Sequence, residues 1–82
     1  MPDISLADRI RDKLDFGLLP RILPEKMRSG YGSDNACSGC DQLILPAQVE
    51  YEFTIDRDVF RLHIGCVGIW LAELRRRGLV TP

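Results

Sequence analysis

Three cysteines and one histidine stand at spacings typical of metal ligands. Two residues separate Cys37 from Cys40, and after 22 intervening residues the pair His63 and Cys66 repeats that separation. Thiolates and imidazoles are preferred donors for Zn²⁺, and four of them complete the tetrahedral shell of a structural site. We therefore expect one structural Zn²⁺ ion, held in a closed Cys₃His site by Cys37, Cys40, His63 and Cys66.

Other uses of these four residues fit the sequence less well. A thioredoxin-like redox pair needs a strand before it and a helix after it, whereas turn-forming residues flank Cys37 and Cys40. A catalytic zinc ion needs an open coordination position, and a deaminase-like site needs an H-x-E motif ahead of its cysteines. The remaining alternative is a metal-free core with three buried cysteines and one histidine. We expect no enzymatic activity and no small-molecule substrate.

Length and composition describe a small soluble domain. The chain has 82 residues, of which 45% are apolar and 28% charged, and we expect residues 1–82 to form one domain. Chains of this size bury only about 60% of their unfolded surface, so a metal ion is a common additional source of stability.

The charge pattern also excludes several classes of partner and compartment. The formal net charge of -1 gives no overall attraction to nucleic acid or to an anionic membrane. No apolar run approaches the about 20 residues that span a bilayer, and acids occupy the N-terminus where a signal peptide carries bases. Three cysteines cannot all pair within one chain, which suits a reducing compartment. We expect a cytoplasmic protein with no membrane partner.

An amphipathic helix and an apolar arm precede the ligands. Ser5 or Asp3 is placed to cap a helix over residues 5–16, and Gly17 is placed to end it. The apolar side of this helix consists of Leu6, Ala7, Ile10 and Leu14. Two prolines prevent residues 18–24 from continuing as a helix, so we expect this arm to lie extended over the core.

The region between the two ligand pairs predicts a β-hairpin. Four apolar residues alternate with Glu50, Glu52 and Thr54 over residues 49–55, the pattern of a strand with one buried face and one solvated face. A turn at residues 56–58 and a second strand at 59–62 then lead to His63. We expect a loop at residues 29–36 and a short strand at 43–45.

A second helix is expected from Ile64 onward. Its apolar stripe is Val67, Trp70, Leu71 and Leu74. Arg75, Arg76 and Arg77 stand in the last turn, where positive charge complements the helix dipole, and Gly78 follows as a helix-ending residue. Because His63 and Cys66 are three residues apart, both fall at the start of this helix.

The order of cysteine knuckle, hairpin and ligand-bearing helix resembles a treble-clef zinc finger over residues 35–77. The spacing is similar to the first half of a LIM domain, but residues 67–69 lack the further cysteine that a LIM domain places there. The wider pattern is similar to small uncharacterised proteobacterial proteins, which implies a bacterial origin but no activity. The resemblance implies an α+β fold, with a helix and arm at 1–34 and a treble-clef module at 35–82.

Two functional hypotheses follow. The first is a protein-interaction or adaptor module, since the arm carries more apolar residues than a small core requires. Its candidate contacts with another protein are Leu18, Leu19, Ile22, Leu23 and Ile69. The alternative is a small nucleic-acid-binding regulator, whose candidate phosphate contacts are Arg57, Arg75, Arg76 and Arg77.

Overall fold

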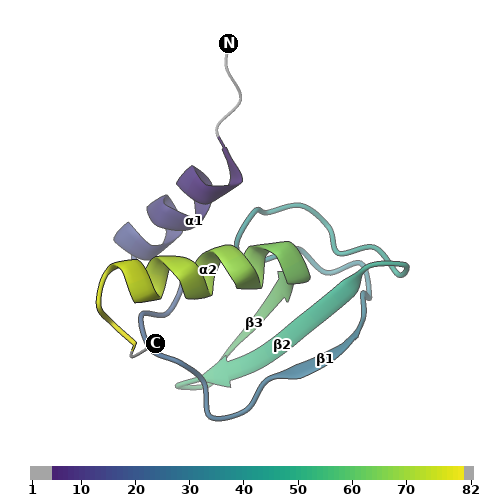
Figure 1. The fold of residues 1–82 in the computed structure, drawn as a ribbon. Coiled ribbons are helices and arrows are strands. Elements are labelled where there is room, and N and C mark those ends of the chain that lie inside the picture. Colours follow the sequence, from purple (N-terminus) through teal and green to yellow (C-terminus); the bar gives the residue numbers. More distant parts are fainter. Residues whose placement is uncertain (1–4, 81–82) are drawn as a thin grey trace.

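The computed structural model describes residues 5–80 and has α+β architecture. Its elements in chain order are α1 (Leu6–Asp15), β1 (Arg28–Tyr31), β2 (Val49–Ile55), β3 (Asp58–His63) and α2 (Ile64–Arg76). The three strands form an antiparallel sheet in the order β1-β2-β3. Helix α2 crosses one face of the sheet, and α1 packs beside α2 (Figure 1).

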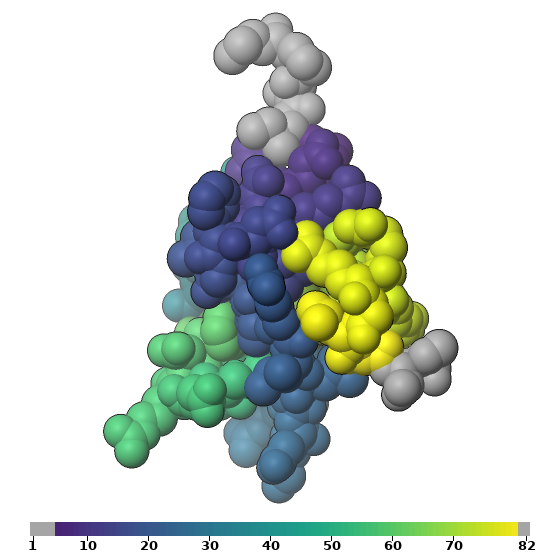
Figure 2. All heavy atoms as spheres, turned by 90° about the vertical axis from the view of Figure 1, so that its left-hand side faces the viewer, coloured from purple at the N-terminus to yellow at the C-terminus, as the bar shows by residue number. Residues whose placement is uncertain are grey.

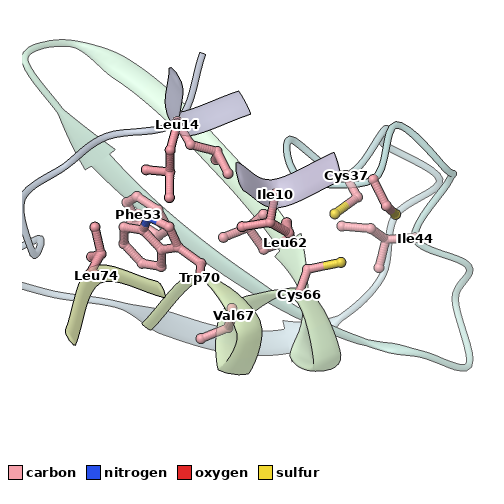
Figure 3. Close-up of a cluster of buried hydrophobic side chains, with 12 residues drawn as sticks. Ile10, Leu14, Cys37, Ile44, Phe53, Leu62, Cys66, Val67, Trp70 and Leu74 are labelled. Carbon is pink, nitrogen blue, oxygen red and sulfur yellow. The ribbon is translucent and has the colours of Figure 1, made fainter. Parts of the chain in front are cut away.

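The core is centred on aromatic stacking between α2 and β2. The rings of Trp70 and Phe53 are nearly parallel, with centroids 5.0 Å apart. The indole Nε1 of Trp70 donates a hydrogen bond to the Pro20 carbonyl oxygen at 2.9 Å, which ties the arm to α2. Figure 3 shows this stack at one end of the buried cluster and the sulfurs of Cys37 and Cys66 at the other end. The three predicted cysteine ligands are therefore part of the core, whereas His63 is half-buried at its edge.

Both helices end as the sequence predicts. Ser5 caps α1 by accepting a hydrogen bond from the Asp8 backbone N–H at 3.1 Å, while the other candidate cap, Asp3, lies outside the described residues. Gly17 and Gly78 follow the two C-caps with φ of 74° and 72°, in the left-handed region that glycine adopts at low cost. Within residues 5–80, neither helix combines the length and apolarity needed to cross a membrane.

The hairpin is confirmed, with a tighter turn than expected. Ile55 pairs directly with Asp58, so the turn consists of Asp56 and Arg57, and Asp58 already belongs to β3. Both turn residues have positive φ, at 49° and 75°, as the two-residue turns that match the twist of a hairpin require.

The loop predicted at residues 29–36 is partly wrong, because residues 29–31 belong to β1. This strand pairs with β2 from Arg28 opposite Glu52 to Tyr31 opposite Val49. All four of its residues are exposed, so it has no buried face and no alternation for a sequence pattern to reveal. The predicted strand at 43–45 is also wrong, since the structure has only an isolated bridge between Leu43 and Ala36.

The arm crosses the molecular surface beside the C-terminal end of α2 (Figure 2). Its residues form bends without regular structure, and the Arg21 side chain donates to the Leu14 carbonyl oxygen. The prediction that Leu19 contacts another protein is wrong. Its side chain packs into the core and only 2% of the residue is exposed. The other three apolar residues of the arm, Leu18, Ile22 and Leu23, are exposed.

A buried carboxylate organises the charged residues at the end of α2. Glu73 is only 5% exposed and binds three guanidinium groups, those of Arg76, Arg77 and Arg11. Arg77 also pairs with Asp15 at 2.9 Å, so this cluster joins α2 to α1. Hydrogen bonding, first of all from Arg76, lowers the pKa of Glu73 to about 2.

Replacing Glu73 by Gln should lower the free energy of unfolding by about 1.5–3 kcal/mol, since charge-assisted hydrogen bonds between the helices are lost. The folded-state pKa lies below the unfolded value, so the carboxylate contributes fully above about pH 4.5 and its contribution is lost as pH falls toward 2. The deficit of E73Q should therefore be equal at pH 6 and pH 8, measured by urea unfolding.

A matched control is Glu52→Gln, which removes a carboxylate from a half-exposed pair with Arg61. That change should cost below about 1 kcal/mol, as exposed ion pairs do. Equal losses in E73Q and E52Q would show that the buried cluster does not stabilise the helix pair.

Candidate metal centre

The structure brings the four predicted ligands together at one end of the core. One ligand atom from each of Cys37, Cys40, His63 and Cys66 lies within 4.8 Å of all the others. The Cys40 Sγ is 3.4 Å from the His63 Nδ1. Tetrahedral coordination at zinc-to-ligand distances of about 2.0–2.3 Å places ligand atoms about 3.5–3.8 Å apart. The cluster can hold one metal ion of that size, with Nδ1 as the histidine donor.

The first ligand pair lies on a knuckle whose backbone hydrogen bonds turn both sulfurs inward. The Cys37 N–H donates to the Gln42 carbonyl oxygen at 2.8 Å, and the Asp41 N–H donates to the Cys37 carbonyl oxygen at 2.9 Å. The Gly39 N–H donates to the Cys37 sulfur at 3.4 Å. Such N–H donors stabilise the thiolate form that a metal ion requires.

Gly39 is needed at this turn for space and not for an unusual backbone conformation. The residue with positive φ in the knuckle is Asp41, at 67°. A Cβ on Gly39 would lie 2.6 Å from the Ile10 Cδ1 and 3.1 Å from the Leu62 Cδ2. The glycine therefore lets the knuckle pack closely between α1 and β3.

Polar contacts on two sides fix the knuckle. On the β3 side, the Ser38 N–H donates to the Arg61 carbonyl oxygen at 2.7 Å, and its hydroxyl accepts from the Arg61 N–H at 3.3 Å. On the α1 side, Arg9 donates to the Cys40 carbonyl oxygen, and Lys13 pairs with Asp41 at 2.7 Å. The knuckle has no regular structure of its own, so these neighbours determine where its sulfurs lie.

The second ligand pair lies at the junction of β3 and α2. His63 is the last residue of β3 and the N-cap of α2, and Cys66 is the third residue of the helix. The positive end of the helix dipole favours a thiolate at that position. One junction thus supplies both an imidazole from the sheet and a sulfur from the helix.

Without a metal ion, the three thiols cannot all ionise together. A hydrogen bond from the Cys66 thiol lowers the pKa of Cys37, and the same bond raises the pKa of Cys66. Burial raises the pKa of Cys40. Binding of a divalent cation must therefore displace protons from the cluster, and its affinity must fall as the pH is lowered.

Acceptors surround the outward-facing nitrogen of His63. The Nε2 atom lies 3.1 Å from the Leu43 carbonyl oxygen and 3.2 Å from the Gln48 Oε1. That Gln48 oxygen also accepts from the Leu45 N–H at 2.8 Å. Segment 43–48 therefore places two acceptors beside the imidazole nitrogen that does not face Cys40, at an exposed position.

The prediction that Glu50 is solvated is wrong. It is only 8% exposed, and its Oε1 atom has no hydrogen-bond partner among residues 5–80. Glu50 stands between Gly30 of β1 and His63 of β3, so its neighbour on one side has no side chain. The other two polar residues of β2 fit the prediction better, since Glu52 is half-exposed and Thr54 is exposed.

The other candidate site residues do not join this cluster. Arg57 is exposed in the hairpin turn and Arg75 is exposed on α2, while Arg76 and Arg77 bind Glu73. Ile69, a candidate protein contact, is partly buried against the core. The buried cluster around Glu73 was not predicted from the sequence. Its sequence pattern is a carboxylate followed by arginines three and four residues later, and this pattern is also common on exposed helices.

Replacing Gly32 by Ala should disturb segment 43–48, because the added Cβ would meet the Leu45 and Ile44 carbonyl oxygens at 2.3 and 2.5 Å. We expect a loss of about 1–3 kcal/mol in unfolding free energy, measured by denaturation of the metal-loaded protein. The control is Gly30→Ala, where the Cβ meets nothing within 4 Å. Similar stability of the two variants would contradict this close approach.

Comparison with known proteins assigns neither a family nor a function to this chain. No family model, curated protein or solved structure matches the chain. The structure itself shows a small α+β protein with a Cys₃His cluster that can hold one metal ion.

Proposed function

We propose that this protein is a non-enzymatic interaction module of the treble-clef type, folded around one structural Zn²⁺ ion. The observation that carries the proposal is the convergence of three thiols and one imidazole within 4.8 Å. This donor set is typical of structural zinc, and four protein ligands leave no coordination position for water or substrate. The ion would hold the knuckle to the β3–α2 junction.

The treble-clef assignment is supported by the order of the parts that carry ligands. Cys37 and Cys40 lie on the knuckle, β2 and β3 form the hairpin, and His63 and Cys66 stand at the start of α2. Apparent zinc-binding free energies of about 10–16 kcal/mol are typical of such peptides. For a chain of 82 residues, that contribution is comparable with the whole stability of an ordinary domain.

The surface offered to a partner protein is the arm patch, which we define as Phe16, Leu18, Ile22 and Leu23. These four side chains are 48–78% exposed and lie within eight consecutive residues. Single exposed apolar residues are ordinary on proteins, whereas a concentration of them is typical of interaction sites. Its neighbours hold the patch in place, since Leu19 packs in the core and the half-buried Pro20 accepts a hydrogen bond from the Trp70 side chain.

The nucleic-acid alternative receives less support from the charge distribution. Two of its four candidate arginines, Arg76 and Arg77, are bound to the buried Glu73 carboxylate. A phosphate would have to compete with those ion pairs. Ion pairing with Glu73 therefore occupies two of the three members of the arginine triplet.

Protein purified without added metal should contain one zinc ion per chain, measured by elemental analysis. Cys40→Ser and His63→Ala should each lose the ion together with most of the α2 signal in circular dichroism, and chelation should do the same to the wild type. Gln42→Ser is the matched control, because Gln42 contacts Cys37 and Cys40 through its backbone, while its side chain is exposed and forms no hydrogen bond with residues 5–80. Purified protein that contains no metal, and whose circular dichroism spectrum is unchanged by a chelator, would exclude a structural ion.

The arm patch should be dispensable for folding but required for binding. Leu18→Ser and Ile22→Ser should each change the free energy of unfolding by less than about 0.5 kcal/mol, because both side chains are exposed. Leu19→Ala should cost about 2–5 kcal/mol, because its side chain is buried. Urea unfolding of the metal-loaded proteins measures all three.

A photo-crosslinking residue at position 22 should yield one discrete protein adduct in the cells that make this chain, and Leu18→Asp should suppress it. Position 58, exposed in the hairpin, is the control. Equal adducts at both positions would contradict a docking role for the patch. Retention on heparin that falls steeply with salt would instead support the nucleic-acid alternative.

A further inference from the structure

The side of the metal centre that faces away from the sulfurs contains an arrangement that the four ligands alone do not explain. Segment 43–48 presents two oxygen acceptors to the His63 Nε2 atom, the Leu43 carbonyl at 3.1 Å and the Gln48 Oε1 at 3.2 Å. One of these acceptors is a side chain, so a substitution can remove it.

The arrangement determines which nitrogen of His63 is free to bind metal. A neutral imidazole carries one proton, and the nitrogen without it is the metal donor. Both neighbours of Nε2 are oxygen atoms that can only accept, so the proton belongs on Nε2. The unprotonated Nδ1 then faces the Cys40 sulfur at 3.4 Å, inside the cluster.

Gln48 is itself held in place, as a residue that orients a ligand must be. Its Oε1 accepts a second hydrogen bond from the Leu45 N–H at 2.8 Å. Its backbone carbonyl accepts from the Gly32 N–H at 2.8 Å, where the pairing of β1 with β2 continues. A Cβ on Gly32 would collide with this segment, which shows how closely the segment packs on the end of β1.

We propose that Gln48 is a positioning residue for the metal ligand His63. By accepting the Nε2 proton, its side chain fixes the tautomer and the ring orientation in which Nδ1 points at the ion. The inference rests on the zinc site of the proposed function. Partners of this kind around metal-bound histidines are typically worth 10–100-fold in metal affinity.

The test is a comparison of zinc dissociation constants, measured by competition with a chromophoric chelator at pH 7.5. Gln48→Leu should weaken zinc binding by about tenfold or more, because the acceptor oxygen is lost. Gln48→Glu should stay within about threefold of the wild type, because it retains an oxygen at the same place. Gln42→Leu, the same substitution in an exposed glutamine of the knuckle, should have no effect.

A double-mutant cycle separates positioning of the imidazole from simple support of the segment. His63→Cys creates a four-cysteine site, which has no outer nitrogen to orient. In that background Gln48→Leu should change zinc affinity by less than twofold. A tenfold loss there as well would overturn the proposal, since Gln48 would then act only through Leu45. An unchanged affinity of Q48L in the wild-type background would overturn it too.

A second measurement applies even where the four-cysteine variant fails to fold. In ¹⁵N-histidine-labelled, zinc-loaded protein, the Nε2 proton of His63 should be observable and protected from exchange. It should exchange faster in Q48L and stay unchanged in Q42L, and unchanged exchange in Q48L would overturn the proposal. Wild-type protein that binds no zinc would contradict the proposed function, whereas zinc-binding protein insensitive to Gln48 would contradict only this inference.

Discussion

The convergence of four ligand atoms within 4.8 Å is the constraint on which the rest of this structure depends. Two of the ligands lie on a knuckle without regular structure, and the other two lie where a strand passes into a helix. Three buried sulfurs at such distances are not stable as three thiolates unless a cation lies between them. Protons on the sulfurs are one means of neutralising them and a divalent ion is the other. The protonated state links the knuckle to α2 through the hydrogen bond between Cys66 and Cys37, whereas an ion would bind all four ligand atoms at once.

The N-terminal half supports this centre and does not merely extend the fold. Helix α1 contacts the knuckle through Arg9 and Lys13, and Ile10 occupies the space that a side chain on Gly39 would fill. The sheet holds the same knuckle from the other side through the backbone of Arg61. Residues 35–82 taken alone would lack the first of these supports. The predicted division at residue 34 therefore separates parts that cooperate in forming one site.

The features predicted correctly from the sequence are those that depend on residues close together along the chain. The ligand pairs, the two apolar helix stripes and strand β2 were predicted from the sequence. The helices and the strand each repeat apolar residues with a fixed period, and the ligand pairs are recognised by their spacing. Strand β1 was not readable, since its four exposed residues pair through backbone groups supplied by β2. The alternating pattern also gave a wrong prediction for Glu50. This residue is on the polar side of its strand, yet it is buried between Gly30 and His63. The burial of Leu19 and Glu73 depends likewise on tertiary neighbours that no local pattern contains.

Helix α2 connects the metal centre to the arm patch. Its first residues follow His63 and include Cys66, while Trp70, four residues later, holds the Pro20 carbonyl of the arm. The ionic cluster around Glu73 then fixes the far end of the same helix to α1. A helix of 13 residues is marginal in isolation, so its formation depends on these attachments. Loss of the ion would release the start of α2 and weaken the packing of Trp70 against Phe53 and its hydrogen bond to Pro20. The surface proposed to dock a partner would therefore depend on the proposed ion without contacting it.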